Sequence, residues 1–312
     1  MNDNIKISIL IPTYNRSSYL KKCLESIISQ NHDDIEIIIS DNNSPDNTAE
    51  IVNQFNDKRI KYYKNENNIG SNANFYKLIE LATGEFIFFL TDDDYLLPGS
   101  IEEIKDFILN NNHLDAFKSD LIVYNEKSKT AFNYKYFDHN VVDKNLDIET
   151  KSKIWQSSHI FTGCCYRRSL IPIGIQNDFF TWYPSMLVFG LFDVNQGYLS
   201  APIAVHVWEN ELFWNIDNKE KDLILLKSKI EILQYLLNKG KKVEYINALA
   251  YRIFEDAAEV YNYELDNFPQ ELIKYLSSVQ IRTIRKAKFK IIIKNALKKL
   301  LLKSINRLKK FL

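Results

Sequence analysis

Short apolar runs alternate with helical patterns through the first 110 residues, and this alternation restricts the fold more than any other feature of the chain. The strand-like runs are rich in β-branched and aromatic residues, and they cover Lys6–Ile11, Ile35–Ser40, Arg59–Lys64 and Phe86–Leu90. Strands that read as nearly continuous apolar runs and alternate with helices predict an α/β fold: a mostly parallel, Rossmann-like sheet covered on both faces.

Helices are predicted between these strands, where apolar residues recur at helical spacing. They cover Ser17–Gln30, a segment ending near Phe55, Ser71–Ala82, and a segment from Pro98 to Asn110. From about residue 120 to 214 the pattern changes to short strands and aromatic loops, and from Lys219 onward it becomes helical. The chain is therefore divided into residues 1–118, residues 119–215 and a helical C-terminal region, residues 216–312.

Composition indicates a folded protein in a reducing compartment. Of 312 residues, 46% are hydrophobic and 13% are aromatic, which excludes a disordered chain. The three cysteines, Cys23, Cys164 and Cys165, cannot form a disulfide framework, and the adjacent pair Cys164-Cys165 is expected to be buried thiols. No signal peptide and no apolar run of about 18 residues is found, so we expect a cytoplasmic protein without a membrane-spanning helix.

Polar residues follow three of the predicted strands. The sequence PTYNR comes after the first strand, DNNS after the second and TDDD after the fourth. Parallel sheets bind ligands beyond the carboxyl ends of their strands, so these three segments should meet at one binding edge.

The run FIFFLTDDDYLLPGS places three consecutive carboxylates at the mouth of a buried strand. Mutual repulsion and desolvation make such a cluster unfavourable unless a positive charge lies among the carboxylates. A divalent cation is one candidate for that charge. The alternative is a solvated acidic loop before a helix, whose N-terminus favours negative charge.

Three segments in order resemble a family 2 glycosyltransferase with the GT-A fold: ISILIPTYNRSSYLKKCLESIISQ, EIIISDNNSPDNT and NNIGSNANFYKLIELATGEFIFFLTDDDYLLPGSI. The resemblance covers roughly residues 5–110. It implies a nucleotide-diphospho-sugar donor, Mn²⁺ or Mg²⁺ as cofactor, and an inverting transfer to an acceptor hydroxyl. On this view residues 1–118 bind the donor and residues 119–215 bind the acceptor.

The resemblance also implies the site residues. The family's Asp-x-Asp metal motif falls on TDDD, with Thr91 in place of the first Asp; the expected metal ligands are Asp93, Asp94 and His206. Asp41 matches a carboxylate that accepts a hydrogen bond from a pyrimidine ring, although an Asp here can also simply cap a turn. The expected donor-binding residues are Pro12, Thr13, Tyr14, Asn15, Arg16, Asp41, Asn42, Asn68, Gly70, Asn74, Asp92 and Asp93.

Other residues depart from the family pattern or leave alternatives open. Ala73 stands where an Arg that holds the nucleotide is often found, so UDP, dTDP, GDP and CDP sugars all remain candidates. His206 contacts the metal or diphosphate, or it is a satisfied core histidine. Arg167 and Arg168 contact phosphate, or they are solvated.

The family often has a Glu-Asp pair that supplies the catalytic base, and the corresponding segment of this chain, NDFFTWYPSMLVFG, contains no such pair. Asp178 is the nearest carboxylate, with Asp193 behind it, and the alternative is that Asp178 is an ordinary loop residue. Trp182 and Tyr183 are candidates to stack on an acceptor sugar or to pack in the core.

The C-terminal tail has a different chemistry. Residues 281–312 contain 12 Lys or Arg and no Asp or Glu, which leaves 28 basic and 40 acidic residues in positions 1–280. One helical face is apolar and the rest is cationic, a pattern typical of helices on anionic membranes. Packing on the catalytic domain is the main alternative, and no nucleic-acid partner is expected. The prediction is a peripheral enzyme on the inner face of the plasma membrane.

The predicted function is therefore a metal-dependent inverting glycosyltransferase in surface-polysaccharide or lipid-linked glycan synthesis. One alternative is a sugar nucleotidyltransferase, but such an enzyme usually carries a Gly-rich, Lys-containing phosphate loop near its N-terminus, and PTYNR does not match that loop. The other alternative is a non-catalytic protein that binds nucleotide sugars on the same scaffold.

Overall fold

The computed structural model describes residues 5–170, 193–208, 229, 231–233, 235–236 and 240–260. The chain divides into two compact units, Met1–Gly240 and Lys241–Leu312, and each is considered by itself. The predicted boundary between residues 215 and 216 lies outside the described residues, as do Asp178, Trp182, Tyr183 and the basic tail.

The N-terminal half of the sheet is parallel. It contains β1 (Ile7–Thr13), β2 (Ile35–Asp41), β3 (Ile60–Lys64) and β4 (Phe86–Phe89), in the order β3-β2-β1-β4. All residues of β2 and nearly all of β1 are buried, because helices cover both faces. The predicted strands and their parallel pairing are confirmed.

The rest of the sheet is mixed. It contains β5 (Tyr95–Leu96), β6 (Ala116–Asn125), β7 (Thr130–Tyr134), β8 (Cys164–Arg167) and β9 (Gln196–Trp208). Strand β8 is antiparallel to β4 and β6, β9 is parallel to β6, and β5 and β7 pair antiparallel with β9 and β6. Within the described residues one continuous sheet therefore joins both halves of the first unit.

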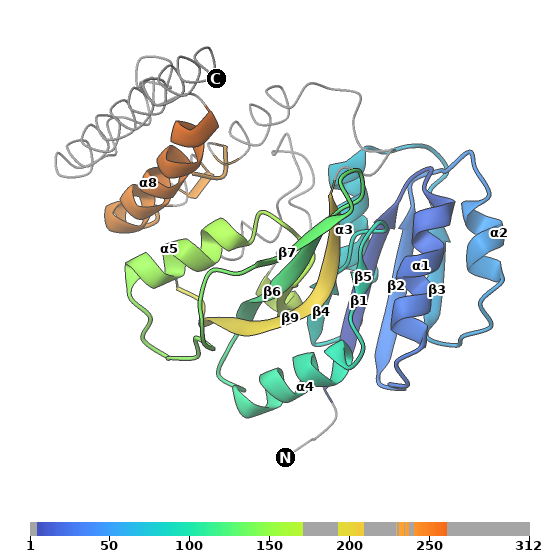
Figure 1. Cartoon of the computed structure of the whole chain (residues 1–312), viewed down its shortest axis with the longest axis horizontal. Coiled ribbons are helices and arrows are strands. Elements are labelled where there is room, and N and C mark those ends of the chain that lie inside the picture. Colours follow the sequence, from blue (N-terminus) through green and yellow to red (C-terminus); the bar gives the residue numbers. More distant parts are fainter. Residues whose placement is uncertain are drawn as a thin grey trace, which may run out of the picture. The chain divides into compact units, whose positions relative to one another are not determined.

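Helices α1 (Ser17–Ile28), α2 (Thr48–Asn53) and α4 (Ser100–Asn110) pack on one face of the sheet, where one cluster of buried side chains joins them to alternate residues of β1, β2 and β4 (Figure 1). Helix α3 (Ser71–Leu81) lies on the opposite face, where the Phe75 ring contacts Phe89 and Phe161 at centroid distances of 5.3 and 4.8 Å. Helix α5 (Ile148–Ser157) contacts β6 and β9. Cys164 and Cys165 are buried thiols, as predicted, and Cys23 is a buried thiol as well.

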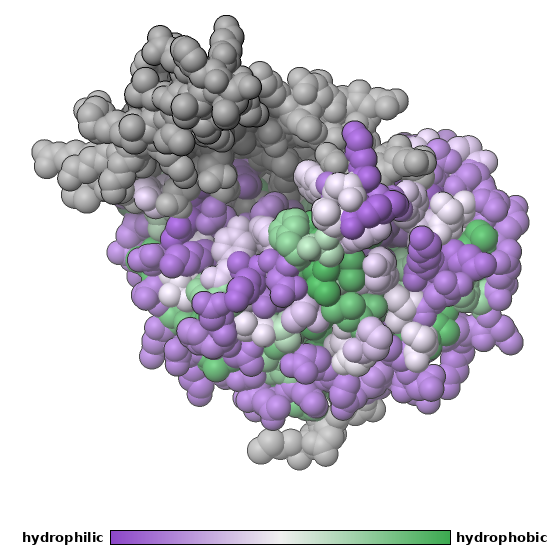
Figure 2. Space-filling view, in the orientation of Figure 1, coloured by the Kyte–Doolittle hydropathy of each residue, from purple (hydrophilic) through white to green (hydrophobic). Residues whose placement is uncertain are grey.

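The second unit contributes helix α8 (Val243–Val260), as predicted. Its buried residues Ile246, Leu249, Ala250 and Ile253 follow helical spacing, so one face of the helix is apolar. None of the helices that the structure describes is long and apolar enough to cross a membrane. On the described surface seen in Figure 2, hydrophilic side chains surround a smaller apolar area near the centre.

Candidate active site

The polar segments after β1, β2 and β4 meet at one edge of the sheet, as predicted. Thr13 Oγ1 donates a 2.7 Å hydrogen bond to Asp92 Oδ2, although 79 positions separate the two residues. The backbone N–H of Asn42 donates to Thr13 O at 2.9 Å. The register of the parallel strands therefore brings the three strand ends into direct contact.

The loop between β1 and α1 is fixed on both sides of Arg16. Asn15 adopts a left-handed φ of 55°, which Asn tolerates, and its N–H donates to Ser44 Oγ at 2.9 Å. The Ser17 N–H donates to Asp46 Oδ2 at 3.0 Å. Within this loop Tyr14 is 46% exposed, so it is available to stack on a flat ligand ring, and Pro12 is half-buried.

Asp41 is completely buried at the end of β2. Its Oδ1 accepts from Ser44 N at 2.8 Å, and its Oδ2 accepts from the Tyr62 hydroxyl at 2.5 Å. The bond to Ser44 is the turn-capping arrangement that the sequence left open as an alternative. A hydrogen bond from a pyrimidine base therefore has to use a remaining lone pair of this carboxylate, and that role stays a prediction.

Three predicted donor-binding amides form a network that shapes the loop before α3. Asn42 Nδ2 donates to Asn68 Oδ1 at 2.8 Å, and Asn42 Oδ1 accepts from Ile69 N at 2.9 Å. Asn74 is buried and bonds through both ends of its amide to Ser40. Gly70 is the N-cap residue before α3, with a φ of 84°, and its N–H donates to Asn68 Oδ1 at 2.9 Å. These side chains therefore position the loop.

Asp92 and Asp93 share one cationic partner from the chain itself. Arg16 Nη1 lies 2.7 Å from Asp93 Oδ2 and 3.3 Å from Asp92 Oδ1. Burial raises the pKa of Asp92 to about 7 against the opposing charge of Arg16, and the Asp93 carboxylate adds to the rise. Burial works to lower the pKa of Arg16, but the two carboxylates outweigh it and raise that pKa, so the guanidinium stays charged.

Asp94 is held by a separate set of donors. Its carboxylate accepts from the Val207 N–H at 2.8 Å, from Thr91 Oγ1 at 2.7 Å and from Thr162 Oγ1, and His206 Nδ1 lies 3.0 Å from Oδ2. Burial works to raise the pKa of Asp94, but His206 and these hydrogen bonds outweigh it and lower that pKa. Burial lowers the pKa of His206, whereas the Asp94 charge raises it, and the net shift is upward.

Buried Lys118 supports the turn at Thr162, whose hydroxyl contacts Asp94, and the sequence did not single out Lys118. Lys118 is fully buried and donates to Thr162 O at 2.8 Å and Ser119 O at 3.1 Å. Burial lowers the pKa of Lys118 to about 8. Gly163 has a φ of +85°, and a Cβ there would lie 2.7 Å from Lys118 Nζ. The pair Thr162-Gly163 in a glycine-poor chain was the only sequence signal for this turn.

A family model for glycosyl transferase family 2 matches residues 8–171, which is more than half of the chain. The chain belongs to glycosyltransferase family 2. That family consists of transferases, and the prediction drawn from the three segments is confirmed.

Curated relatives of this family 2 chain match it over its N-terminal part. It is 44% identical over 102 residues to a Campylobacter jejuni GalNAc(5)-diNAcBac-PP-undecaprenol beta-1,3-glucosyltransferase, covering 32% of this chain and 33% of that protein. It is 39% identical over 100 residues to the Bacillus subtilis putative glycosyltransferase EpsH, covering 31% and 29%. The chain thus spans about a third of the length of these relatives.

Solved structures similar to this family 2 chain have the GT-A fold, which confirms the predicted fold class. S. aureus TarS 1-349 in complex with UDP-GlcNAc matches with a TM-score of 0.65 at 18% identity, covering 88% of this chain and 83% of that chain. The Pyrobaculum calidifontis mannosyltransferase PcManGT, in complex with GDP-Man and Mn²⁺, matches with a TM-score of 0.55 at 14% identity, covering 95% and 81%.

The residues at the strand ends of this family 2 chain fit a divalent cation that is shared with a ligand. Mg²⁺ and Mn²⁺ are usually bound by one or two carboxylates together with substrate phosphates and water. Asp92 and Asp93 offer such carboxylates. His206 turns Nδ1 to Asp94, the arrangement that orients a metal-ligating imidazole. Within the described residues, no group of three or more acidic, His or Cys side chains forms a complete metal cage.

Direct ligation by Asp94 stays a prediction, because its oxygens already accept bonds from His206, Val207, Thr91 and Thr162. Arg167 pairs with Glu85 and lies 4.6 Å from the centroid of the Phe86 ring, at the start of β4. It is therefore at the opposite edge of the sheet from the Asp cluster, which favours a structural role. The predicted base Asp178 lies outside the described residues.

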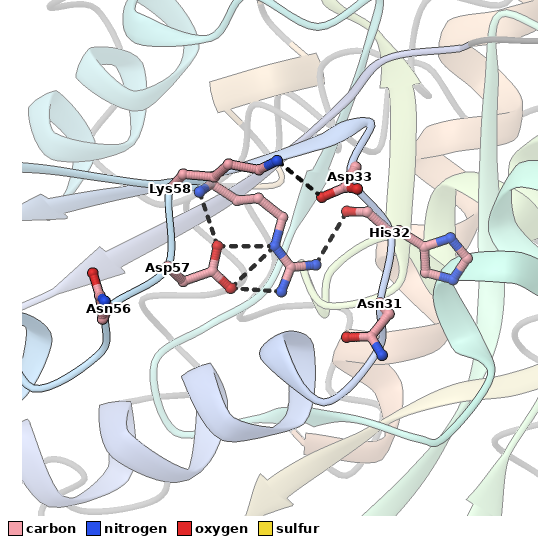
Figure 3. A pocket seen from close by; sticks show the side chains of 7 residues that line it. Asn31, His32, Asp33, Asn56, Asp57 and Lys58 are labelled. Carbon is pink, nitrogen blue, oxygen red and sulfur yellow. Dashed lines mark hydrogen bonds and ion pairs between the residues drawn. The ribbon is translucent and has the colours of Figure 1, made fainter.

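A polar hollow of about 480 Å³ lies at the amino ends of β2 and β3, lined by Asn31, His32, Asp33, Asn56, Asp57, Lys58 and Arg59 (Figure 3). Arg59 pairs with Asp57 at 2.6 Å and donates to the backbone carbonyls of Ile28, Gln30 and His32. These bonds close the C-terminal end of α1. Because parallel strands begin here, the hollow is at the edge opposite the predicted ligand edge.

Proposed function

We propose that this chain is an inverting, metal-dependent glycosyltransferase that moves a sugar from a nucleotide-diphosphate donor to an acceptor hydroxyl. The observation that supports the proposal most directly is the convergence of Thr13, Asp92 and Asp93 with Arg16 at the ends of β1 and β4, in a chain of family 2. Carboxylates and a guanidinium at such an edge match the charges of a diphosphate and its cation.

Each part of the donor has a partner in this proposal. The exposed Tyr14 ring stacks on the base, with Asp41 as its polar partner, while Arg16 and the N-terminal end of α1 face the diphosphate. Asp92, Asp93 and His206 hold the cation, which when bound stabilises the negative charge of the departing diphosphate. Pyrimidine and purine nucleotides are both candidate donors, since one structural neighbour is bound to UDP-GlcNAc and another to GDP-Man.

The proposed transfer is a single in-line displacement. Asp178 accepts the proton of the acceptor hydroxyl, whose oxygen forms a bond to the anomeric carbon on the face opposite the leaving group. The bond from that carbon to the β-phosphate oxygen breaks, and the nucleoside diphosphate leaves with its electron pair. The products are a glycoside of inverted anomeric configuration, a nucleoside diphosphate and a protonated Asp178.

The proposed acceptor is a lipid-linked or surface glycan. A relative that is 44% identical over 102 residues is named for a substrate on PP-undecaprenol. The sequence of residues 281–312 combines strong positive charge with apolar residues at the spacing predicted for one helical face. We propose that this tail holds the enzyme on the anionic cytoplasmic surface of the membrane, and that residues 1–118, 119–215 and 216–312 act as donor-binding, acceptor-binding and membrane-directed parts.

A donor panel tests the proposed reaction. The protein is incubated with UDP, GDP, dTDP and CDP sugars and Mn²⁺, and the released products are separated by chromatography. Release of nucleoside diphosphate and free sugar, abolished by EDTA, supports a transferase, because donors hydrolyse slowly without an acceptor. Release of pyrophosphate would indicate a nucleotidyltransferase, and binding without any release would indicate a non-catalytic binding protein.

Deletion of Ile281–Leu312 tests the membrane proposal. Co-sedimentation with vesicles containing about 30% phosphatidylglycerol should fall at least tenfold for the truncated chain, since each basic residue near an anionic surface contributes about 1 kcal/mol. Donor hydrolysis in solution should be retained. Equal vesicle binding by the full and truncated chains would contradict the role of the tail.

A further inference from the structure

The side chain of Arg16 lies where a cation for Asp92 and Asp93 would be expected. Its Nη1 is 2.7 Å from Asp93 Oδ2 and 3.3 Å from Asp92 Oδ1, and the two carboxyl side chains are only 4% and 6% exposed. Asp92 Oδ2 is already bonded to Thr13 Oγ1. The guanidinium therefore neutralises the same oxygens that a divalent cation would use.

Arg16 is a cation that the fold itself supplies to both members of this carboxylate pair. Asp94 takes its donors from a different group, which includes His206, Val207 and Thr162. Asp92 and Asp93 are two neighbouring buried carboxylates, and both pair with Arg16. In a low-dielectric site such a pair is stabilised by a positive charge that lies against it, or by a proton on one member.

A divalent cation and the guanidinium cannot both take this position without strong repulsion. The backbone of Arg16 has no freedom to leave, because Asn15 N is bonded to Ser44 Oγ at 2.9 Å and Ser17 N to Asp46 Oδ2 at 3.0 Å. Exchange between the two cations therefore requires a rotation of the Arg16 side chain about a fixed backbone.

We propose that Arg16 occupies the cation position of the donor-free enzyme and is exchanged for the divalent cation when the donor binds. The displaced guanidinium then pairs with the diphosphate, which lies within reach of the same loop at the start of α1. This inference rests on the proposed function, because it assumes that donor and cation bind at this edge of the sheet.

The exchange predicts coupled binding. The metal alone has to break the ion pairs of Arg16 without gaining a new partner for it, whereas metal and nucleoside diphosphate together supply one. Each ligand should therefore tighten the binding of the other by the same factor. The coupling depends on Arg16, so it should shrink when that side chain loses its charge.

The test measures two dissociation constants in full-length Arg16→Gln and wild type. Binding of Mn²⁺ alone is followed by electron paramagnetic resonance of the free ion, and binding of UDP or GDP at saturating Mn²⁺ by calorimetry. In Arg16→Gln, we expect Mn²⁺ alone to bind about tenfold tighter and the nucleotide about tenfold weaker, a coupling of ordinary size. Arg16→Lys should fall between the two proteins.

Lys21→Gln is the matched control, because it removes one positive charge from an exposed position in α1 and should change neither constant. A purely structural role for Arg16 would weaken both ligands, and this result, or unchanged Mn²⁺ affinity, would overturn the exchange. If wild type binds no nucleotide at all, the proposed function fails, while the Mn²⁺ measurement still tests whether Arg16 competes for Asp92 and Asp93.

A second measurement does not depend on any variant folding. Crystal structures of the wild-type chain with and without Mn²⁺ and UDP or GDP should differ in the Arg16 side chain. Separation of Nη1 from Asp93 beyond hydrogen-bonding distance, with the guanidinium on a phosphate, supports the exchange. An Arg16–Asp93 bond that persists beside a bound Mn²⁺ would overturn it.

Discussion

Buried carboxylates lie at both edges of the sheet, but their partners differ. At the amino edge, Glu36 in β2 accepts from Ser8 Oγ at 2.5 Å, from Thr83 N at 2.6 Å and from Lys61 Nζ at 2.6 Å. At the carboxyl edge, Asp92 and Asp93 both pair with one long, rotatable side chain, that of Arg16. Several donors from different elements therefore hold Glu36, whereas a rotatable side chain pairs with Asp92 and Asp93, the two carboxylates that we propose exchange this partner for a divalent cation.

Asp94 shows that the same distinction holds within one run of three residues. Backbone and hydroxyl donors fix Asp94, as they fix Glu36, whereas Asp93 next to it is paired with Arg16. Four changes would break or sharpen this comparison.

The largest effect is expected for Asp93→Asn. Removing the carboxylate should reduce Mn²⁺-dependent donor turnover by a factor on the order of 10²–10³, because the charge that holds the cation against the diphosphate is lost. The free energy of unfolding should change little, because losing the ion pair of buried Asp93 is offset by losing its repulsion of Asp92, which still pairs with Arg16. Exposed Asp106 in α4 offers the matched control, Asp106→Asn. Donor turnover that equals wild type in Asp93→Asn would remove Asp93 from the site.

Asp94→Asn should act mainly on stability. An amide nitrogen facing Val207 N–H, His206 or the two Thr hydroxyls leaves buried donors unmatched, so we expect a loss of about 3 kcal/mol in the free energy of unfolding. Urea denaturation measures it. A variant as stable as wild type would mean that the hydrogen bonds to Asp94 do not stabilise the fold in the way proposed for those to Glu36.

Glu36→Gln tests the stabilising role of Glu36 through the pH dependence of the free energy of unfolding. Lysine and hydroxyl partners outweigh the effect of burial and lower the pKa of Glu36 to about 2. A carboxyl whose folded pKa is lowered stabilises the protein above its unfolded pKa, and that contribution is lost as pH falls from about 4.5 towards 2. Glu36→Gln should therefore be less stable than wild type by on the order of 2 kcal/mol at pH 6. In urea titrations the gap should narrow towards pH 3; a gap that does not depend on pH would contradict this role.

The smallest effect is expected for Thr162→Val, which removes one hydroxyl from Asp94. We expect a loss of about 1 kcal/mol in the free energy of unfolding. Thr162→Ser keeps the hydroxyl and should remain close to wild type. A Thr162→Ser variant that is as unstable as Thr162→Val would show that the methyl group matters more than the bond to Asp94.

The parallel half of the fold could be predicted because its signals are local. The apolar run of β2, the turn residues after it and the stop at Gly84 each indicate an element boundary within a few positions. The short strand β5 was missed, since Tyr95 and Leu96 become a strand only by pairing with Val205 and Ala204 of β9. Likewise, the irregular register between Ser119 and Leu121 arises from pairing with distant residues of β9.

The candidate site divides in the same way. The strand ends that carry Thr13 and Asp92 could be brought together from the sequence, because parallel strands end at a common edge. The partner of each carboxylate could not, because Asp94 and His206 are 112 positions apart and Arg16 is 77 positions from Asp93. Only the folded chain shows that backbone and hydroxyl donors hold Asp94, while Arg16 pairs with Asp93.

The most direct measurement is Mn²⁺-dependent donor turnover by wild type and Asp93→Asn across the four nucleotide classes, with nucleoside diphosphate and pyrophosphate quantified together. A glycosyltransferase with its cation at Asp92 and Asp93 should release nucleoside diphosphate from one class, in wild type alone and only with the metal. Equal release by both proteins, release that EDTA does not affect, or pyrophosphate as the product would contradict the account.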